Sequence, residues 1–167
     1  MQKLIIIRGP SGAGKSAVAR ELLQRRTRPT LLVSEDQVRK MFSDHHRTGH
    51  SEGEKLSVAA VLFGLQNGYD VIYEGILNIK TTGRSLPDLI RSHKKSYLFY
   101  LDVSYEKTLR RHQTRPEKAE FKEEAIERWW EYASPTGHVS ETVVPESSSL
   151  DDTIKTINRV ADLGLEK

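Results

Sequence analysis

The chain has 167 residues, of which 37% are hydrophobic and 29% charged, with a formal net charge of +3 and no cysteine. This length is typical of one domain with a buried core, so we expect a single domain over residues 1–167. The absence of cysteine excludes disulfides, thiolate nucleophiles and cysteine-based zinc sites. Neither a bilayer-spanning apolar run nor a signal-peptide pattern is found, so we expect a cytoplasmic protein without membrane contact.

Segments typical of strands alternate along the chain with segments typical of helices. Strands are predicted at residues 3–8, 30–34, 70–74, 96–102 and 141–144. Helices are predicted at residues 15–26, 36–42, 54–66, 84–92, 104–113, 120–132 and 150–163. In the third of these helices, Leu56, Ala59, Ala60 and Phe63 form one apolar helix face. The alternation predicts an α/β fold with a five-stranded parallel sheet, helices on both faces and ligands at the carboxyl ends of the strands.

Residues 9–16, Gly-Pro-Ser-Gly-Ala-Gly-Lys-Ser, match the P-loop (Walker A) pattern G-x-x-x-x-G-K-[ST] between a predicted strand and a predicted helix. Small residues let the backbone N–H groups converge on a phosphate, and the helix start adds the positive end of its dipole. Lys15 is predicted to reach the β- and γ-phosphates of ATP, and the Ser16 hydroxyl to bind Mg²⁺. Together with these two residues, the predicted ATP-binding residues are Gly12, Ala13 and Gly14. The predicted fold is therefore the three-layer α/β/α P-loop NTPase fold.

Two common classes of P-loop protein fit the sequence poorly. The Asn-Lys-x-Asp segment of guanine-specific GTPases is absent, and strand 70–74 ends in the single acid Glu74 where larger ATPase machines carry paired acids. Over about residues 3–163, the chain resembles the family of small P-loop kinases that includes polynucleotide 5′-kinase, the zeta toxins and chloramphenicol phosphotransferase. The resemblance implies a kinase that transfers the γ-phosphoryl group of Mg-ATP to a hydroxyl.

The resemblance also implies roles for three residues on the acceptor side. The family carries Asp-x-x-Arg after the second strand, and Asp36-Gln37-Val38-Arg39 matches it. Asp36 is therefore expected to take the proton of the attacking hydroxyl, and Arg39 to orient the acceptor or a phosphate. A carboxylate at a strand end opposite the P-loop is also what a general base requires. Glu35 is the alternative base, and residues 34–36 also have the pattern of a helix N-terminus. By resemblance, Glu74 is expected beside Mg²⁺ or the acceptor.

The predicted helix at 104–113 leads into a basic segment. The family carries a lid here with two arginines four residues apart, and Arg111 and Arg115 have that spacing, followed by Pro116. We therefore expect a small helical lid over about residues 111–122, whose arginines neutralise the transferring phosphoryl group and contact ATP. By the same resemblance, residues 143–147 are expected to lie near the adenine.

Two further groups of residues leave more than one interpretation open. The cluster of His45, His46 and His50 suits plain surface or the border of the acceptor pocket better than a metal site. Trp129 and Trp130 suit a helix core better than stacking on a ligand.

The function that these patterns favour is phosphorylation of a small hydroxylated molecule, such as a nucleoside, a sugar or an antibiotic. A polynucleotide 5′-hydroxyl kinase is the nearest alternative, but the acidic balance of residues 117–167 disfavours nucleic acid. A toxin-like kinase, or a nucleotide-binding switch without phosphotransfer, controlled by a protein partner, is the second alternative. The sequence does not indicate an oligomeric state.

Overall fold

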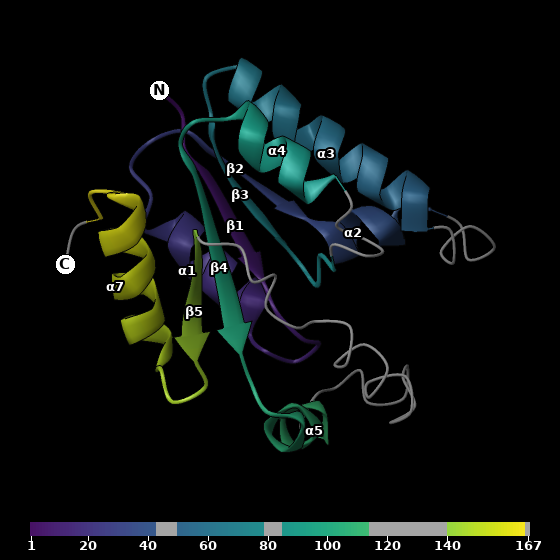
Figure 1. Ribbon diagram of the computed structural model, residues 1–167, viewed down its shortest axis with the longest axis vertical. Helices are drawn as coiled ribbons and strands as arrows, with labels where there is room; N and C mark the ends of the chain where they lie inside the picture. The colour runs from purple at the N-terminus through teal and green to yellow at the C-terminus, as the bar shows by residue number, and fades with distance from the viewer. Residues whose placement is uncertain (43–49, 79–84, 114–139, 166–167) are drawn as a thin grey trace.

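The computed structural model describes residues 1–42, 50–78, 85–113 and 140–165, which form one sheet with helices on both faces (Figure 1). The strands are β1 (Leu4–Arg8), β2 (Thr30–Ser34), β3 (Asp70–Gly75), β4 (Ser96–Asp102) and β5 (Glu141–Pro145). The helices are α1 (Lys15–Gln24), α2 (Glu35–Lys40), α3 (His50–Gln66), α4 (Leu86–Ser92), α5 (Tyr105–Gln113) and α7 (Leu150–Ala161). The helix predicted at 120–132 lies outside the described residues.

The sheet has the strand order β2-β3-β1-β4-β5, and every neighbouring pair is parallel. The central strand β1 is buried along its whole length, as its unbroken apolar sequence requires in a sheet covered on both faces. Because β2, β3 and β1 lie side by side, their carboxyl ends meet: Ser34 is in register with Glu74, and Arg8 with Gly75. The predicted fold class, a three-layer α/β/α fold with five parallel strands, is confirmed.

Alternate side chains of β1 serve two separate cores. Ile5 and Ile7 pack with residues of α1 and α7 on one face, and Leu4 and Ile6 pack with residues of α3 and α4 on the other (Figure 1). Each buried aliphatic side chain of this kind contributes about 1.5–3 kcal/mol to folding. Helix α5 lies beyond the carboxyl end of β4, outside both helical layers. Within the described ranges, we find no helix that is both long enough and apolar enough to cross a membrane.

The face on which α3 packs differs from the predicted one. Leu56 is 42% exposed and Phe63 is 61% exposed, Ala59 is exposed, and Ala60 is only half-buried. The side that faces the sheet instead carries Val61, which is fully buried. The prediction of a buried face made of the four apolar residues at positions 56, 59, 60 and 63 is therefore wrong for three of them.

A close approach between α3 and the sheet explains this difference. A Cβ atom added to Gly64 would lie 2.8 Å from Cγ2 of Val71 and 2.9 Å from Cδ2 of Leu31. Such distances leave no room for a side chain at position 64, so the helix approaches the sheet at this glycine, and Leu56 and Phe63 are left on the outer side. Periodicity of apolar residues alone cannot reveal a face that is selected for small volume.

This packing predicts opposite effects for two glycine-to-alanine changes in the same helix. Gly64→Ala should destabilise the protein by about 1–3 kcal/mol, because the added methyl group must displace side chains of a packed core. The matched change Gly53→Ala meets only Arg39 atoms at 3.7 Å or more, so the gain in helix propensity should dominate and stabilise by up to about 1 kcal/mol. Urea unfolding of both variants measures the difference, and equal effects would contradict the packing described.

Candidate functional site

The loop between β1 and α1 has the backbone of a phosphate-binding loop. Gly12 and Gly14 have φ angles of +80° and +98°, in the left-handed region that side chains rarely adopt. Gly14 is the N-cap residue of α1, and no side-chain hydrogen bond caps this helix. The positive end of the α1 dipole therefore faces the loop, which is the arrangement that favours an anion.

Lys15, the first residue of α1, belongs to this loop in space as well as in sequence. Its side chain is largely buried, and Nζ donates a hydrogen bond of 2.8 Å to the carbonyl oxygen of Pro10. The ammonium group therefore lies across the loop from the helix start, on the side where the predicted phosphates would bind.

Glu74 joins the phosphate loop to the end of β2. The Ser16 hydroxyl donates to Oε1 of Glu74 at 3.0 Å, and the Ser34 hydroxyl donates to the same oxygen at 2.6 Å. Ser34 occupies the N-cap position of α2 but makes no cap hydrogen bond from its side chain, because its hydroxyl is directed to Glu74 instead. Glu74 itself is 3% exposed. Three segments distant in sequence therefore converge on one carboxylate oxygen.

The donor set at this point suits a magnesium ion. Mg²⁺ prefers oxygen ligands, is usually bound by one or two protein groups, and keeps several waters or takes phosphate oxygens. The Ser16 hydroxyl and the Glu74 carboxylate supply two oxygens that lie 3.0 Å apart. Among the described residues as a whole, no group of three or more His, Asp or Glu side chains is arranged to hold a metal, so a Mg²⁺ here would depend on these two oxygens together with phosphate and water.

The two neighbouring acids at the start of α2 have different surroundings. Glu35 is 4% exposed and packs against Gly75, and its burial raises the pKa of its carboxyl group, although Arg39 opposes the shift. The Asp36 carboxyl is half exposed. Partial burial works to raise the pKa of Asp36, but hydrogen bonds from Lys40 and Arg39 outweigh it and lower that pKa. Asp36 is thus held as an accessible carboxylate, whereas Glu35 is buried, within range of the charges of Lys15 and Glu74.

Arg39 connects both acids from the next turn of α2. Its Nη2 lies 3.1 Å from Oδ1 of Asp36, and its Nη1 lies 3.9 Å from Oε1 of Glu35. Lys40 makes a second ion pair with Asp36, at 3.0 Å. The Asp36-x-x-Arg39 pattern is therefore a direct side-chain contact within α2, and Arg39 links it to the buried Glu35.

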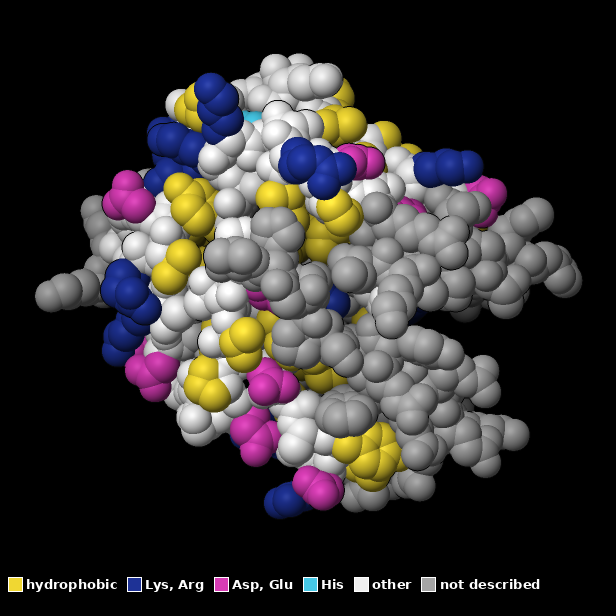
Figure 2. Space-filling view, viewed as in Figure 1, with side chains coloured by type: hydrophobic (Ala, Val, Ile, Leu, Met, Phe, Trp, Pro, Cys, Tyr) yellow, Lys and Arg dark blue, Asp and Glu magenta, His cyan; other side chains and the backbone are white. Residues whose placement is uncertain are grey.

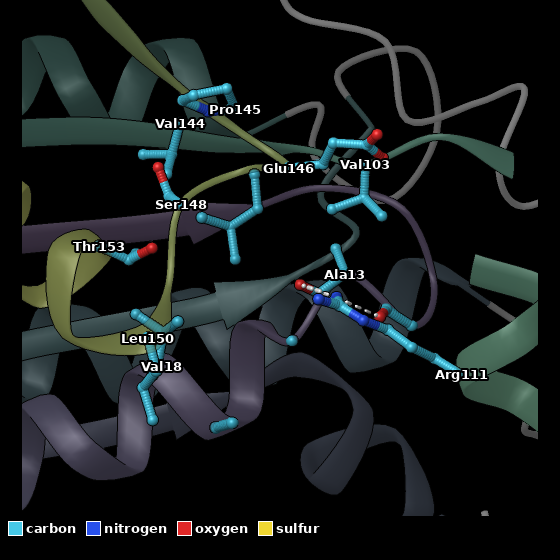
Figure 3. Close-up of a pocket in the computed structure, with 14 residues that line it drawn as sticks. Ala13, Val18, Val103, Arg111, Val144, Pro145, Glu146, Ser148, Leu150 and Thr153 are labelled. Carbon is cyan, nitrogen blue, oxygen red and sulfur yellow. Dashed lines mark hydrogen bonds between the residues drawn. The ribbon is translucent and has the colours of Figure 1, made fainter. Parts of the chain in front are cut away.

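Arg111 reaches the phosphate loop from α5. Its Nη1 donates to the carbonyl oxygens of Ala13 at 2.9 Å and Gly12 at 3.2 Å (Figure 3). This places one of the two predicted lid arginines beside the predicted ATP-binding residues. The other, Arg115, lies outside the described residues, as does most of the predicted lid, and so do His45 and His46, Trp129 and Trp130.

A cavity of about 380 Å³ opens beside the loop on the α1 and α7 side of the sheet (Figure 3). Its walls include the apolar side chains of Val18, Val103 and Val144, and the turn between β5 and α7 closes one side. Residues 144–146, within the segment expected near adenine, line this cavity. An apolar slot that adjoins a phosphate loop has the form needed for a flat base attached to phosphates.

Sequence reasoning missed several residues of the site. The sequence places Ser34 at the end of a strand and at a helix N-terminus but does not indicate its contact with Glu74, which is forty residues away. Val103, the residue after β4, and Thr153, in α7, line the cavity without any local motif. The available signal for both is that they follow the carboxyl ends of β4 and β5, where ligands bind in a parallel sheet.

Comparison with known families assigns residues 4–136 to a family described as an AAA domain. A comparison with curated proteins found no match.

Several solved structures have the same fold at low sequence identity. A gluconokinase from Sinorhizobium meliloti is 18% identical, with a TM-score of 0.66, and the match covers 96% of this chain and 91% of that one. The APS kinase of Mycobacterium tuberculosis, in complex with AMPPNP and APS, is 17% identical, with a TM-score of 0.70 and coverage of 96% and 98%. The tunicamycin resistance protein of Deinococcus radiodurans is 16% identical, with a TM-score of 0.72 and coverage of 100% and 99%.

Proposed function

The chain belongs to the AAA domain family, and we propose that it is a kinase that transfers the γ-phosphoryl group of ATP to a hydroxyl of a small molecule. ATP and the acceptor alcohol give ADP, the phosphate monoester and a proton. The fold shared with gluconokinase and APS kinase supports nucleotide-dependent phosphotransfer as the reaction type. The acceptor hydroxyl and the assignment of residues below are our proposal.

The observation that carries the proposal is the convergence of two hydroxyls on Glu74. Ser16 belongs to the phosphate loop and Ser34 to the strand that leads into the Asp36-x-x-Arg39 unit, and both donate to Oε1 of Glu74. A nucleotide-binding side and an acceptor side are thereby held at a fixed separation. A protein that only binds nucleotide needs the first side but has no use for the second.

The phosphate side of the reaction is assigned to three residues. Lys15 binds the β- and γ-phosphates, and Arg111 approaches the same loop from α5, so that charge developing on the phosphoryl oxygens meets fixed positive charge. Ser16, with Glu74, would hold the Mg²⁺. When bound there, Mg²⁺ supplies neutralisation of the β- and γ-phosphate oxygens. Arg115 is proposed as a second lid arginine on sequence grounds.

The acceptor side is assigned to Asp36 and Arg39. Asp36 is accessible, and the lowered pKa of its carboxyl keeps it deprotonated, so it can accept the proton of an attacking hydroxyl. Arg39 holds that carboxylate in place and can orient the acceptor. Glu35 is the alternative base, but its burial leaves little surface for a substrate to reach.

A small acceptor is favoured over a polynucleotide by surface charge. On the face shown in Figure 2, basic and acidic side chains of the described residues are interspersed, and we see no basic stripe of the kind that tracks a phosphate backbone. Two of the similar structures are by name kinases of small molecules, gluconokinase and APS kinase. A polynucleotide kinase and a partner-controlled nucleotide switch are the competing functions.

A turnover screen tests the proposed reaction. Purified protein is incubated with Mg-ATP and separate pools of nucleosides, sugars, aminoglycosides and 5′-hydroxyl oligonucleotides, and ADP formation is followed. We expect one small-molecule pool to stimulate turnover, and Lys15→Ala to abolish it, because the loop then lacks its phosphate-binding ammonium. Stimulation by oligonucleotides alone would assign the polynucleotide reaction. ATP binding without stimulation by any pool would favour the switch.

The role of Asp36 is tested with the acceptor that the screen identifies. Asp36→Asn should lower turnover by about two orders of magnitude or more, in line with general-base contributions. ATP affinity should change little, because the Asp36 carboxylate pairs with Arg39 and Lys40 on its own helix. Glu35→Gln serves as the matched control and should cost less than Asp36→Asn.

The pH dependence of activity gives a second test of whether Asp36 or Glu35 is the base. A general base must be deprotonated, so activity falls as the pH drops through its pKa. The lowered pKa of Asp36 predicts no acid limb above the ordinary carboxyl range, whereas the raised pKa of Glu35 would place a limb above it. An acid limb that disappears in Glu35→Gln would transfer the role to Glu35.

A further inference from the structure

A buried arginine that the reaction does not use lies at the centre of the carboxyl edge of the sheet. Arg8, the last residue of β1 and the residue before the phosphate loop, is 1% exposed. Its Nε donates to the carbonyl oxygen of Leu77 at 3.2 Å, and its Nη1 donates to Oε1 of Glu141 at 2.9 Å. The Glu141 side chain is 2% exposed, so both charges of this pair are withdrawn from water. Breaking a buried ion pair of this kind by removing one partner is strongly destabilising.

The carbonyl group that Arg8 binds belongs to a strained turn. Leu77 has a φ of +46°, in the left-handed region that a branched side chain rarely adopts, and its side chain is fully buried. It lies three residues after Glu74, where the chain leaves β3. Such a conformation persists only when its surroundings impose it, and the bond from Arg8 acts directly on the peptide group of this residue.

Contacts with β4 and β5 hold the guanidinium on the side of β1 away from β3. Arg8 Cζ lies 5.2 Å from the centroid of the Tyr100 ring on β4. Burial, followed by the charge of Asp102, raises the pKa of Tyr100 to about 12, so the ring beneath the cation is a neutral phenol. Glu141 is the first residue of β5, beyond β4 in the sheet. One side chain on β1 therefore spans from the chain that follows β3 to the edge strand β5.

We propose that Arg8 is a positioning residue that imposes the turn at Leu77 and so fixes Glu74 and the chain that follows it on the acceptor side. Glu141 is its counter-ion and holds the guanidinium in the orientation that presents Nε to Leu77. The link between this turn and acceptor binding rests on the proposed function. The claim that Arg8 imposes the conformation of Leu77 is independent of it. Arginine suits this position because its planar fork binds in two directions at once, which a lysine ammonium on a flexible stem cannot reproduce.

Backbone NMR of the labelled protein tests the turn without any activity measurement. In Arg8→Lys, the backbone chemical shifts of Leu77 should leave the left-handed pattern, or its signals should double, with the changes extending to Glu74. If Arg8→Lys does not fold, Glu141→Gln replaces it, because glutamine keeps the shape of the counter-ion. It should change the shifts of Leu77 in the same direction but by less. Tyr100→Phe keeps the ring under the cation and is the control that should leave Leu77 unchanged. A left-handed Leu77 in folded Arg8→Lys would overturn the proposal.

A rescue variant separates positioning from general stability. Glycine adopts positive φ without strain, so the Leu77→Gly background should no longer need Arg8 to impose the turn. Once an acceptor is identified, Arg8→Lys should raise the KM for the acceptor at least fivefold and keep the KM for ATP within twofold. In the Leu77→Gly background, most of the rise in the acceptor KM should be lost. Equal effects in both backgrounds, or a parallel rise of the two KM values, would contradict the positioning role. A wild-type protein that phosphorylates nothing would refute the proposed function alone, since the NMR result would still decide the turn.

Discussion

The arrangement of the site depends on one carboxylate oxygen, Oε1 of Glu74, which accepts from both Ser16 and Ser34. This contact is possible because the strand order brings β1, β3 and β2 together, so that their carboxyl ends open at one edge. The phosphate loop follows the first of these strands and the Asp36-x-x-Arg39 unit follows the last. The proposed nucleotide side and the proposed acceptor side are thus related through the backbone of the sheet.

The sheet also separates two environments. Its α1 and α7 side offers the apolar cavity beside the loop, lined by residues such as Val18 and Val144. At the other side, buried polar groups gather near the edge, among them Glu35 and the Arg8–Glu141 pair. An apolar slot suits a base, and an accessible carboxylate such as Asp36 suits a hydroxyl. This division is what phosphotransfer between two unlike substrates requires, because each substrate must be recognised by different chemistry.

Features that lie within one stretch of sequence could be predicted, whereas contacts between residues far apart in sequence could not. Residues 9–16 were recognisable because every element of the phosphate loop lies in one stretch of sequence. The position of Ser34 at a helix N-terminus is confirmed, but its partner is not predictable, because an N-cap hydroxyl usually bonds to its own helix and here the tertiary structure directs it to Glu74. Phe63 belongs to the apolar face predicted to be buried, but it is exposed, because α3 packs on the sheet through the side that carries Gly64. The pairing of Arg8 with Glu141 spans 133 positions and has no local signature.

The most direct test of this account is calorimetric titration of ATP, with Mg²⁺ and with EDTA, into the wild-type protein and Glu74→Gln. The glutamine keeps the size of the side chain and an acceptor oxygen for the two serines but is a poor ligand for Mg²⁺. We expect Mg²⁺ to tighten ATP binding by about tenfold or more in the wild type, and this advantage to be largely lost in Glu74→Gln, with similar affinities in EDTA. An equal Mg²⁺ advantage in both proteins, or none in the wild type, would contradict the placement of the metal-nucleotide at Glu74.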